Sequence, residues 1–521
     1  MGPTTRAVGG AALLALVAGA LFFQDLGRYP LLDPDEARHA EVAREMAAWQ
    51  GLRRFFLPTL DLVPYREKPA GYYWLVALAY GALGVGEAAA RAVSALAALV
   101  AVLSLYAYAL PRWGLAAGLG AGLVAATSAG WFGLARYGNL DMTVTACVTL
   151  GVLRGLAWLE RPAPRGAPLV PYVAAGLGLL VKGPLAVLLV AGPLALAVLA
   201  RPARPRVAEL GLVRGTLAIV ALGALLYVPV GLIDAGYLSA FAATHVRRLG
   251  PASPHAGPIY YYLLWLPALL LPWTLFAPGP LRRAARDPAR RPLLLWALFV
   301  PAVLTLARGK LATYALSALA PLALLVGTEL ASGPAAKDRW MLRLGGALVA
   351  LALVAGAGAA LFAARGHLAL PARSLLALAG LGWAVGLMLA LGRERVDLVP
   401  ATVLGAVLTV YPLAVRGVAP VVAALHSDRE AARLIAGAGT PPVVAFGIHD
   451  PSLTFYLRAP VIHTDDTKLV RDLFAGDGLA FLLTGRRHFA QVEQLLGAQA
   501  HLWLETPRRR LYANRPANGS S

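Results

Sequence analysis

The residues with the clearest potential for chemistry form an acidic cluster, Asp-Pro-Asp-Glu at 33–36, directly after the first apolar segment. Glu67 and Lys68 follow about thirty residues later. Charge is scarce elsewhere, because the chain is 59% hydrophobic and only 14% charged. Ionisable groups beside membrane-length apolar runs are costly and usually mark a functional site. Asp35 and Glu36 are therefore candidate catalytic residues.

A helix start is the alternative explanation for this cluster. Asp33 could be the N-cap, Pro34 the first helical residue and Glu36 the reciprocal capping partner, since residues 37–49 have a helical apolar pattern. This alternative explains Asp33 and Glu36 but leaves Asp35 free. Asp35 is therefore the stronger catalytic candidate.

A second carboxylate, Asp141, lies at the predicted outer mouth of another span and is a third candidate catalytic residue. Two carboxylates on one face can act as a base and an electrophile stabiliser, or can hold a divalent cation. Asp35 and Asp141 are thus candidate metal ligands, although an isolated Asp at a helix start is often only a cap. The residues leave open whether any reaction needs the ion.

Cations at the same predicted surface suit a phosphate, since Arg offers a bidentate fork and Lys a point charge. Snorkelling toward lipid headgroups is the alternative. Lys182, in Lys-Gly-Pro, fits a tight turn as well as a ligand contact, and neither His245 nor His255 has the compact spacing of a metal site. The candidate phosphate ligands are Lys68, Arg247, Arg248, Lys310 and Tyr314, with Asp33, Glu67, His245 and Arg308 as supporting residues.

The elements that must position these residues are membrane spans. Many apolar runs in this 521-residue chain reach the roughly 20 residues needed to cross a bilayer. The net charge of +20 comes from short basic clusters between those runs, which is typical of cytoplasmic loops and argues against nucleic-acid binding. The single cysteine, Cys147, excludes an intramolecular disulfide.

Basic clusters give the topology, because each complete span changes sides. The apolar segment at 70–84 is short for a membrane span and rich in aromatic residues, so it is predicted to form an interfacial or re-entrant helix. All the clusters then fall inside, the candidate site residues fall outside, and about thirteen spans result. The clusters are Arg112; Arg161 and Arg165; Arg201, Arg204 and Arg206; Arg282, Arg283, Arg286, Arg290 and Arg291; Lys337, Arg339 and Arg343; and Arg393 with Arg395. The predicted spans are 7–24, 88–110, 115–134, 140–158, 169–181, 184–200, 210–233, 259–278, 292–307, 314–331, 343–363, 374–391 and 398–415.

Two domains are expected. Residues 1–415 form a polytopic α-helical membrane domain with an outer loop at 25–87, and residues 416–521 form a small soluble α/β domain on the outer face. Short apolar stretches at 443–446, 480–483 and 502–504 predict strands, and 427–435 and 487–496 predict helices.

Seven motifs occur in a characteristic order: DPDEARHAE, EKPAGYYW, RYGNLDM, KGP, HVRR, LPW and RGKLATY. Together they resemble the ArnT and protein-mannosyltransferase-like GT-C glycosyltransferases, over residues 7 to about 330. The last domain matches in its placement and in DPSLTFYL at 450–457. A departure is Thr244, where many relatives have Glu, which leaves the acceptor open.

The resemblance implies an enzyme of the bacterial inner membrane that transfers a sugar from polyprenyl (undecaprenyl) phosphate to an acceptor on the outer face. By this analogy Asp35, with Glu36 beside it, is the catalytic carboxylate of the first outer loop, and Asp141 is the second acidic position. Lys68, Arg247 or Arg248, and Tyr314 would contact the donor phosphate. Lipid A, another glycan and a protein remain possible acceptors.

Two other functions are compatible with the residues. A transporter or flippase for lipid-linked sugars would also need a cationic membrane cavity, although the polar groups here gather at one surface and not at the midplane. A structural or assembly subunit that binds through its last domain is the other alternative.

Overall fold

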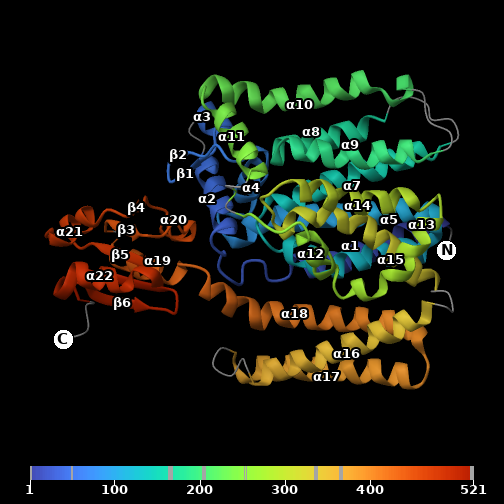
Figure 1. The fold of residues 1–521 in the computed structure, drawn as a ribbon. Helices are drawn as coiled ribbons and strands as arrows, with labels where there is room; N and C mark the ends of the chain where they lie inside the picture. Colours follow the sequence, from blue (N-terminus) through green and yellow to red (C-terminus); the bar gives the residue numbers. More distant parts are fainter. Residues whose placement is uncertain are drawn as a thin grey trace.

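The computed structural model describes residues 3–48, 51–161, 168–201, 207–250, 253, 255–333, 338–362, 368–439 and 441–516. Arg165, Arg204, Arg206 and Lys337, which the topology prediction used, lie outside these residues. A bundle of long helices carries a small α/β domain at one end, and the N-terminus lies at the opposite end (Figure 1).

The described part of the chain has eight helices that are long and apolar enough to cross a bilayer, or nine if α13 (Pro278–Arg286) and α14 (Arg291–Leu306) form one bent span. Shorter apolar helices are α8 (Leu169–Lys182), α9 (Pro184–Leu199) and α12 (Tyr261–Leu270). The chain is thus a multi-span membrane protein, and the number of thirteen crossings stays a prediction. The long helices are α1 (Pro3–Phe23), α5 (Glu87–Thr127), α7 (Leu140–Leu159), α10 (Leu212–Ile233), η3 (Ala312–Ala318) with α15 (Leu319–Ser332), α16 (Arg339–Phe362), α17 (Leu370–Gly392) and α18 (Val399–Leu425).

The 41-residue α5 is two helices and not one. Gly114, with φ +85°, interrupts it, and a Cβ on Gly118 would lie 3.0 Å from the ring of Tyr106. In a continuous helix Tyr106 and Gly118, twelve residues apart, would be separated by about 18 Å along the axis, at about 1.5 Å per residue. The chain therefore reverses at Gly114, close to the boundary predicted between the spans 88–110 and 115–134, and α6 (Ala129–Ala135) follows.

The predicted span 259–278 is wrong as a single helix. Helix α12 ends at Leu270, and the chain continues through Leu271-Pro272 into the short η2 (Trp273–Phe276). Proline lacks the backbone N–H that a helix requires, and the carbonyl of Leu271 accepts a hydrogen bond from Ala129 N at 2.8 Å. The break thus joins this segment to α6.

The predicted outer loop folds into short elements at the end of the bundle next to the soluble domain (Figure 1). Helix α4 covers the predicted interfacial segment and is too short to cross a bilayer. The elements are α2 (Asp35–Ala47), α3 (Leu52–Phe56), β1 (Thr59–Leu60), β2 (Val63–Pro64) and α4 (Gly71–Leu83); further along the chain, η1 (Val207–Leu210), α11 (Tyr237–Leu249) and η5 (Val396–Leu398) complete the membrane part.

The C-terminal domain has a five-stranded sheet in the order β4-β3-β5-β7-β6, with β3 parallel to β4 and β5, and β7 antiparallel to β5 and β6. Helix α18 continues to Leu425, so the soluble part begins later than the predicted residue 416. The predicted strands match β3, β5 and β6, and small apolar cores cover the sheet. The elements are α19 (Arg429–Gly437), β3 (Val443–Phe446), α20 (Pro451–Leu457), β4 (Ile462–Thr464), α21 (Thr467–Ala475), β5 (Phe481–Gly485), η6 (Arg486–His488), α22 (Phe489–Leu496), η7 (Gly497–Gln499), β6 (His501–Glu505) and β7 (Arg509–Ala513).

Helix α20 docks the soluble domain onto the first loop. Tyr456 Oη accepts from Leu31 N at 2.8 Å, and Thr454 donates to Asp61 at 2.9 Å. Ser452 binds both oxygens of Asp33, through its backbone N at 2.9 Å and through its hydroxyl. The alternate polar residues of the DPSLTFYL motif therefore form the contact between the two domains.

Candidate active site

A polar cavity of about 220 Å³ lies where α2, α7, α8 and α11 meet the loop before α4. The structure brings some of the predicted polar residues together at this cavity from distant parts of the sequence. The predicted residues that line the cavity are Asp35, Glu67, Lys68, Asp141, Arg247, Arg248 and Tyr314.

Other lining residues had weaker sequence signals. Arg38 and His39 lie three and four positions after Asp35, so they share its face of α2. Lys182 and Tyr65 also line the cavity. Five Lys and Arg side chains and three carboxylates surround it, which leaves an excess of two positive charges (five minus three). The cavity is thus suited to an anion.

Asp35 is the first residue of α2 and remains on the open side of the cavity. Its side chain is 43% exposed, and Oδ1 accepts a hydrogen bond from Arg38 Nη1 at 3.1 Å. The second oxygen is available to an incoming hydroxyl group, because no hydrogen bond to it exists within the described residues. Asp35 therefore has the access and orientation that a general base needs.

Lys68 is brought to the cavity by a close crossing of α4 and α8. A Cβ on Gly71 would lie only 2.5 Å from the carbonyl oxygen of Leu180, so this position requires glycine. The crossing places Lys68 and Lys182 at one cavity. Burial, and then the charges of Arg248 and Lys182, lower the pKa of Lys68 to about 7. A phosphate bound here would relieve this repulsion.

Asp141 is paired and is not a helix cap. The side chain of Asn139 caps α7 by accepting from Asp141 N at 2.9 Å. Asp141 instead forms a buried ion pair with Lys182, whose Nζ lies 4.0 Å from the centre of the Tyr314 ring. The sequence allowed two roles for the Lys-Gly-Pro segment, a tight turn or a ligand contact, and the structure is compatible with both. Gly183, with φ +90°, makes the turn, while Lys182 lines the cavity.

His39 contributes a neutral ring to the wall of the cavity. It is 5% exposed, and Nδ1 lies 3.0 Å from Tyr73 Oη. Burial, and then the charges of Lys68 and Arg38, hold the pKa of His39 well below its usual range. His39 can therefore donate or accept a hydrogen bond without adding charge.

Glu36 lies outside the cavity and is fully buried. Its carboxylate binds Arg91 through two contacts, at 2.7 and 2.8 Å, and accepts from Gly138 N at 2.9 Å. Arg91 also donates to the carbonyls of Leu26, Tyr29 and Pro30. Glu36 therefore fixes the first loop against α5. The alternative explanation, a helix-capping pair of Asp33 and Glu36, does not hold, because α2 begins at Asp35 with no side-chain cap.

Four other predicted residues do not line the cavity. Lys310 is 4% exposed, and its Nζ donates to the carbonyls of Ala307 and Gly257, so it ties two loops together. His245 Nδ1 contacts Phe241 O at 2.9 Å, and burial lowers the pKa of His245. Arg308 is exposed, and Asp33 contacts the soluble domain.

Metal binding by Asp35 and Asp141 stays a prediction. Within the described residues, the group of three His, Cys, Asp or Glu side chains close enough for one ion is Asp33, Asp428 and Asp450, and it lies at the domain junction. Arg509 already forms ion pairs with Asp428 and Asp450.

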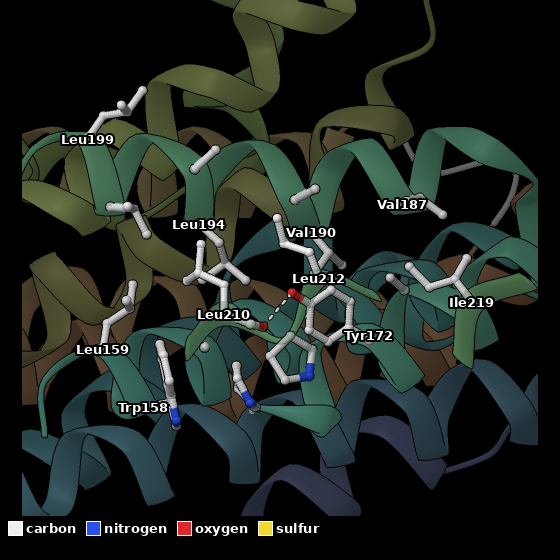
Figure 2. Close-up of a pocket in the computed structure, with 17 residues that line it drawn as sticks. Trp158, Leu159, Tyr172, Val187, Val190, Leu194, Leu199, Leu210, Leu212 and Ile219 are labelled. Carbon is white, nitrogen blue, oxygen red and sulfur yellow. Dashed lines mark hydrogen bonds between the residues drawn. The ribbon is translucent and has the colours of Figure 1, made fainter. Parts of the chain in front are cut away.

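A larger cavity of about 410 Å³ lies between α7, α8, α9 and α10 (Figure 2). It is at the far end of the helices that carry Asp141 and Lys182, since Trp158 and Tyr172 line it. Of its 17 lining residues, only these two have polar side-chain atoms, and Tyr172 Oη donates to Leu210 O at 2.9 Å. This cavity suits hydrocarbon and not a charged group.

The helical bundle, the cationic cavity at one end and the appended sheet domain define a GT-C-type membrane protein. A family model described as dolichyl-phosphate-mannose-protein mannosyltransferase matches residues 67–233. The chain belongs to the ArnT family, whose members are named undecaprenyl phosphate-alpha-4-amino-4-deoxy-L-arabinose arabinosyl transferases.

A relative with that name from Pectobacterium carotovorum is 31% identical over 71% of this chain and 69% of its own length. One from Pseudomonas aeruginosa is 32% identical over 66% of this chain, and the match spans 65% of that relative. The crystal structure of apo ArnT from Cupriavidus metallidurans has a TM-score of 0.82 and 22% identity, covering 99% of each chain. Its form bound to undecaprenyl phosphate has a TM-score of 0.81 and 21% identity, covering 98% of this chain and 99% of that one.

Proposed function

We propose that this chain is a membrane glycosyltransferase that moves a sugar from undecaprenyl phosphate to an acceptor hydroxyl group. The relatives' names favour aminoarabinose as the sugar. Lipid A is our proposed acceptor, and a protein or another glycan is the alternative. The observation that carries the proposal is the convergence of Asp35 with Lys68 and Arg248 at one cationic cavity.

The proposed reaction is a single displacement with inversion. The acceptor oxygen attacks the anomeric carbon while Asp35 takes its proton. The bond from that carbon to the phosphate oxygen breaks, and the electron pair leaves with undecaprenyl phosphate. Lys68 and Arg248 stabilise the charge that develops on the leaving group. Asp141 holds Lys182 in place as a further cation.

Transfer by the purified chain tests this proposal. Wild type and Asp35→Asn would be supplied with undecaprenyl-phosphate aminoarabinose and with lipid A or peptide acceptors. Because a positioned base contributes about 10²–10⁴-fold, we expect Asp35→Asn to lower kcat by that factor. Asp397→Asn, at an exposed pair with Arg395, is the matched control. Donor binding without transfer to any acceptor would instead support a flippase.

The proposed location is the bacterial inner membrane, with the cavity and the soluble domain on the periplasmic face. The basic clusters at the other ends of the helices support this orientation.

Two glycines are suitable positions for a labelling test of this orientation. Gly478 lies in an exposed turn of the soluble domain, Gly392 ends α17 beside Arg393, and both have open space for a side chain. Cys147 is the single native cysteine.

Cysteine labelling tests that orientation. In a Cys147→Ala background, we expect an impermeant maleimide to label Gly478→Cys in cells with a permeabilised outer membrane. Gly392→Cys should react only after lysis. The reverse pattern would place the cavity on the cytoplasmic side.

A further inference from the structure

A basic cavity of about 320 Å³ lies at the other end of the bundle from the candidate active site. It is lined by Gly279, Arg282, Arg283, Arg286, Asp338 and Trp340. Three guanidinium groups face one carboxylate, which leaves an excess of two positive charges (three minus one). We propose that this cavity binds the phosphodiester headgroup of an anionic glycerophospholipid, with an acyl chain lying along α16.

The orientation of α13 places its arginines at a membrane surface. Helices α13 and α14 are bent by 116° at a short break. If α14 runs along the bilayer normal, α13 lies within 26° of the membrane plane (116 minus 90). Gly279, Pro280 and Ala284 are its buried face, whereas Arg282 and Arg286 are exposed. This is the arrangement of an interfacial amphipathic helix.

The three arginines differ in their existing partners. Arg283 contacts Glu329 at 2.5 Å and Asp338 at 3.1 Å, so its charge is already balanced. Arg282 is 57% exposed, forms an ion pair with Asp338 at 3.3 Å, and has its guanidinium carbon 5.9 Å from the centre of the Trp340 ring. In the described part of the chain Arg286 has no ion pair. Arg282 and Arg286 are one turn apart on the same face, so both can reach one phosphate.

An exposed apolar stripe continues from the cavity. Trp340 is 47% exposed, Leu344 51%, Leu348 40% and Leu351 64%. Their spacing of four, four and three residues puts them on one face of α16. From Trp340 to Leu351 the stripe is about 16 Å long, close to half of the roughly 30 Å hydrocarbon core. A diacyl lipid therefore matches both parts of the surface, whereas a free phosphate would use only the cavity.

Lipid binding to the purified, delipidated full chain tests the proposal. Native mass spectrometry and thermal unfolding would compare dioleoyl phosphatidylglycerol with dioleoyl phosphatidylcholine, which has the same acyl chains. We expect phosphatidylglycerol to bind at least fivefold more tightly and to raise Tm. Arg286→Gln should remove most of this preference. Arg393→Gln, an exposed arginine beyond α17, should retain it.

Three results would overturn the proposal. Equal binding of the two lipids would show that the guanidinium groups do not select the headgroup. An equal loss in Arg286→Gln and Arg393→Gln would indicate general surface charge. Full stabilisation by inorganic phosphate alone would indicate a small-anion site. Both arginines are exposed, so neither variant removes a buried contact.

Discussion

Lys68 is the residue whose protonation connects the geometry of the cavity to a measurable pH dependence. Its lowered pKa, about 7, results from burial and from the neighbouring charges of Arg248 and Lys182. Below that pH the ammonium group can bind a phosphate, and above it the group becomes neutral. The proposed sugar donor is a phosphodiester, which would keep one negative charge throughout this range.

We expect kcat/KM to fall above pH 7, by about tenfold for each pH unit, because this ratio reports the free enzyme. In Lys68→Arg the alkaline decrease should disappear even if the rate is lower, since a guanidinium group stays protonated. Transfer rates between pH 6 and 9 would check this. An unchanged decrease in Lys68→Arg would assign it to another group.

Neighbouring residues in the sequence can have unrelated roles, and this limited what could be predicted for the site. Asp35 and Glu36 are adjacent, yet successive helical residues point about 100° apart, so one faces the cavity and the other faces Arg91. Lys310 and Lys182 both stand at the end of a predicted span, but of these two lysines only Lys182 lines the cavity. Residue type and spacing identified the loops correctly. They could not give the direction of each side chain.

At the scale of elements, the buried pair of Glu36 and Arg91 joins α2 and the first loop to α5. Both side chains are 0% exposed. Removing one partner of such a pair leaves an uncompensated buried charge, which costs about 3–5 kcal/mol.

Glu36→Gln should therefore lower the free energy of unfolding by about 3 kcal/mol or more, while Asp35→Asn leaves Tm nearly unchanged. Thermal unfolding in detergent, with kcat measured on the folded fraction, would separate the two roles. A Glu36→Gln protein with normal Tm and lost kcat would restore Glu36 as a catalytic residue.

Hydropathy predicted most helices because the bilayer requires long apolar runs. Hydropathy gave a wrong prediction at 259–278. The helix ends at Leu270, but the residues that follow it and contact α6 are as apolar as those of a span. Strand β7 was missed because its Arg509-Arg510 start is polar, although Leu511 and Ala513 are buried in the sheet. In both cases the structure depends on contacts with residues far away in the sequence, the hydrogen bond from Ala129 to Leu271 and the pairing of β7 with β5. A local sequence pattern does not contain this information.

At the scale of the whole molecule, one carboxylate joins the two domains. Asp33 accepts two hydrogen bonds from Ser452 and lies beside Asp428, Asp450 and Arg509. Burial, and then the charge of Asp428, raise the pKa of Asp33 to about 7.

A raised pKa means that the folded state binds the carboxyl proton of Asp33 more tightly than the unfolded state does. The contribution of protonated Asp33 to stability is therefore complete below pH about 4. It is lost as pH rises through about 7. We expect Tm of the wild type to decrease from pH 5 to pH 8, and Asp33→Asn to decrease less. Asp397→Asn, far from the junction, should follow the wild type. Parallel curves for all three proteins would show that Asp33 is not the group responsible.

The contact between Asp33 and Ser452 also has a consequence for biogenesis, because the two residues are 419 positions apart. The ribosome completes the partner of the first loop only near the end of synthesis. Until that last segment has been made and has folded, the loop that holds Asp35 lacks its α20 contacts. A chain that ends before α20 would therefore contain all the membrane helices and still leave the first loop without these hydrogen bonds.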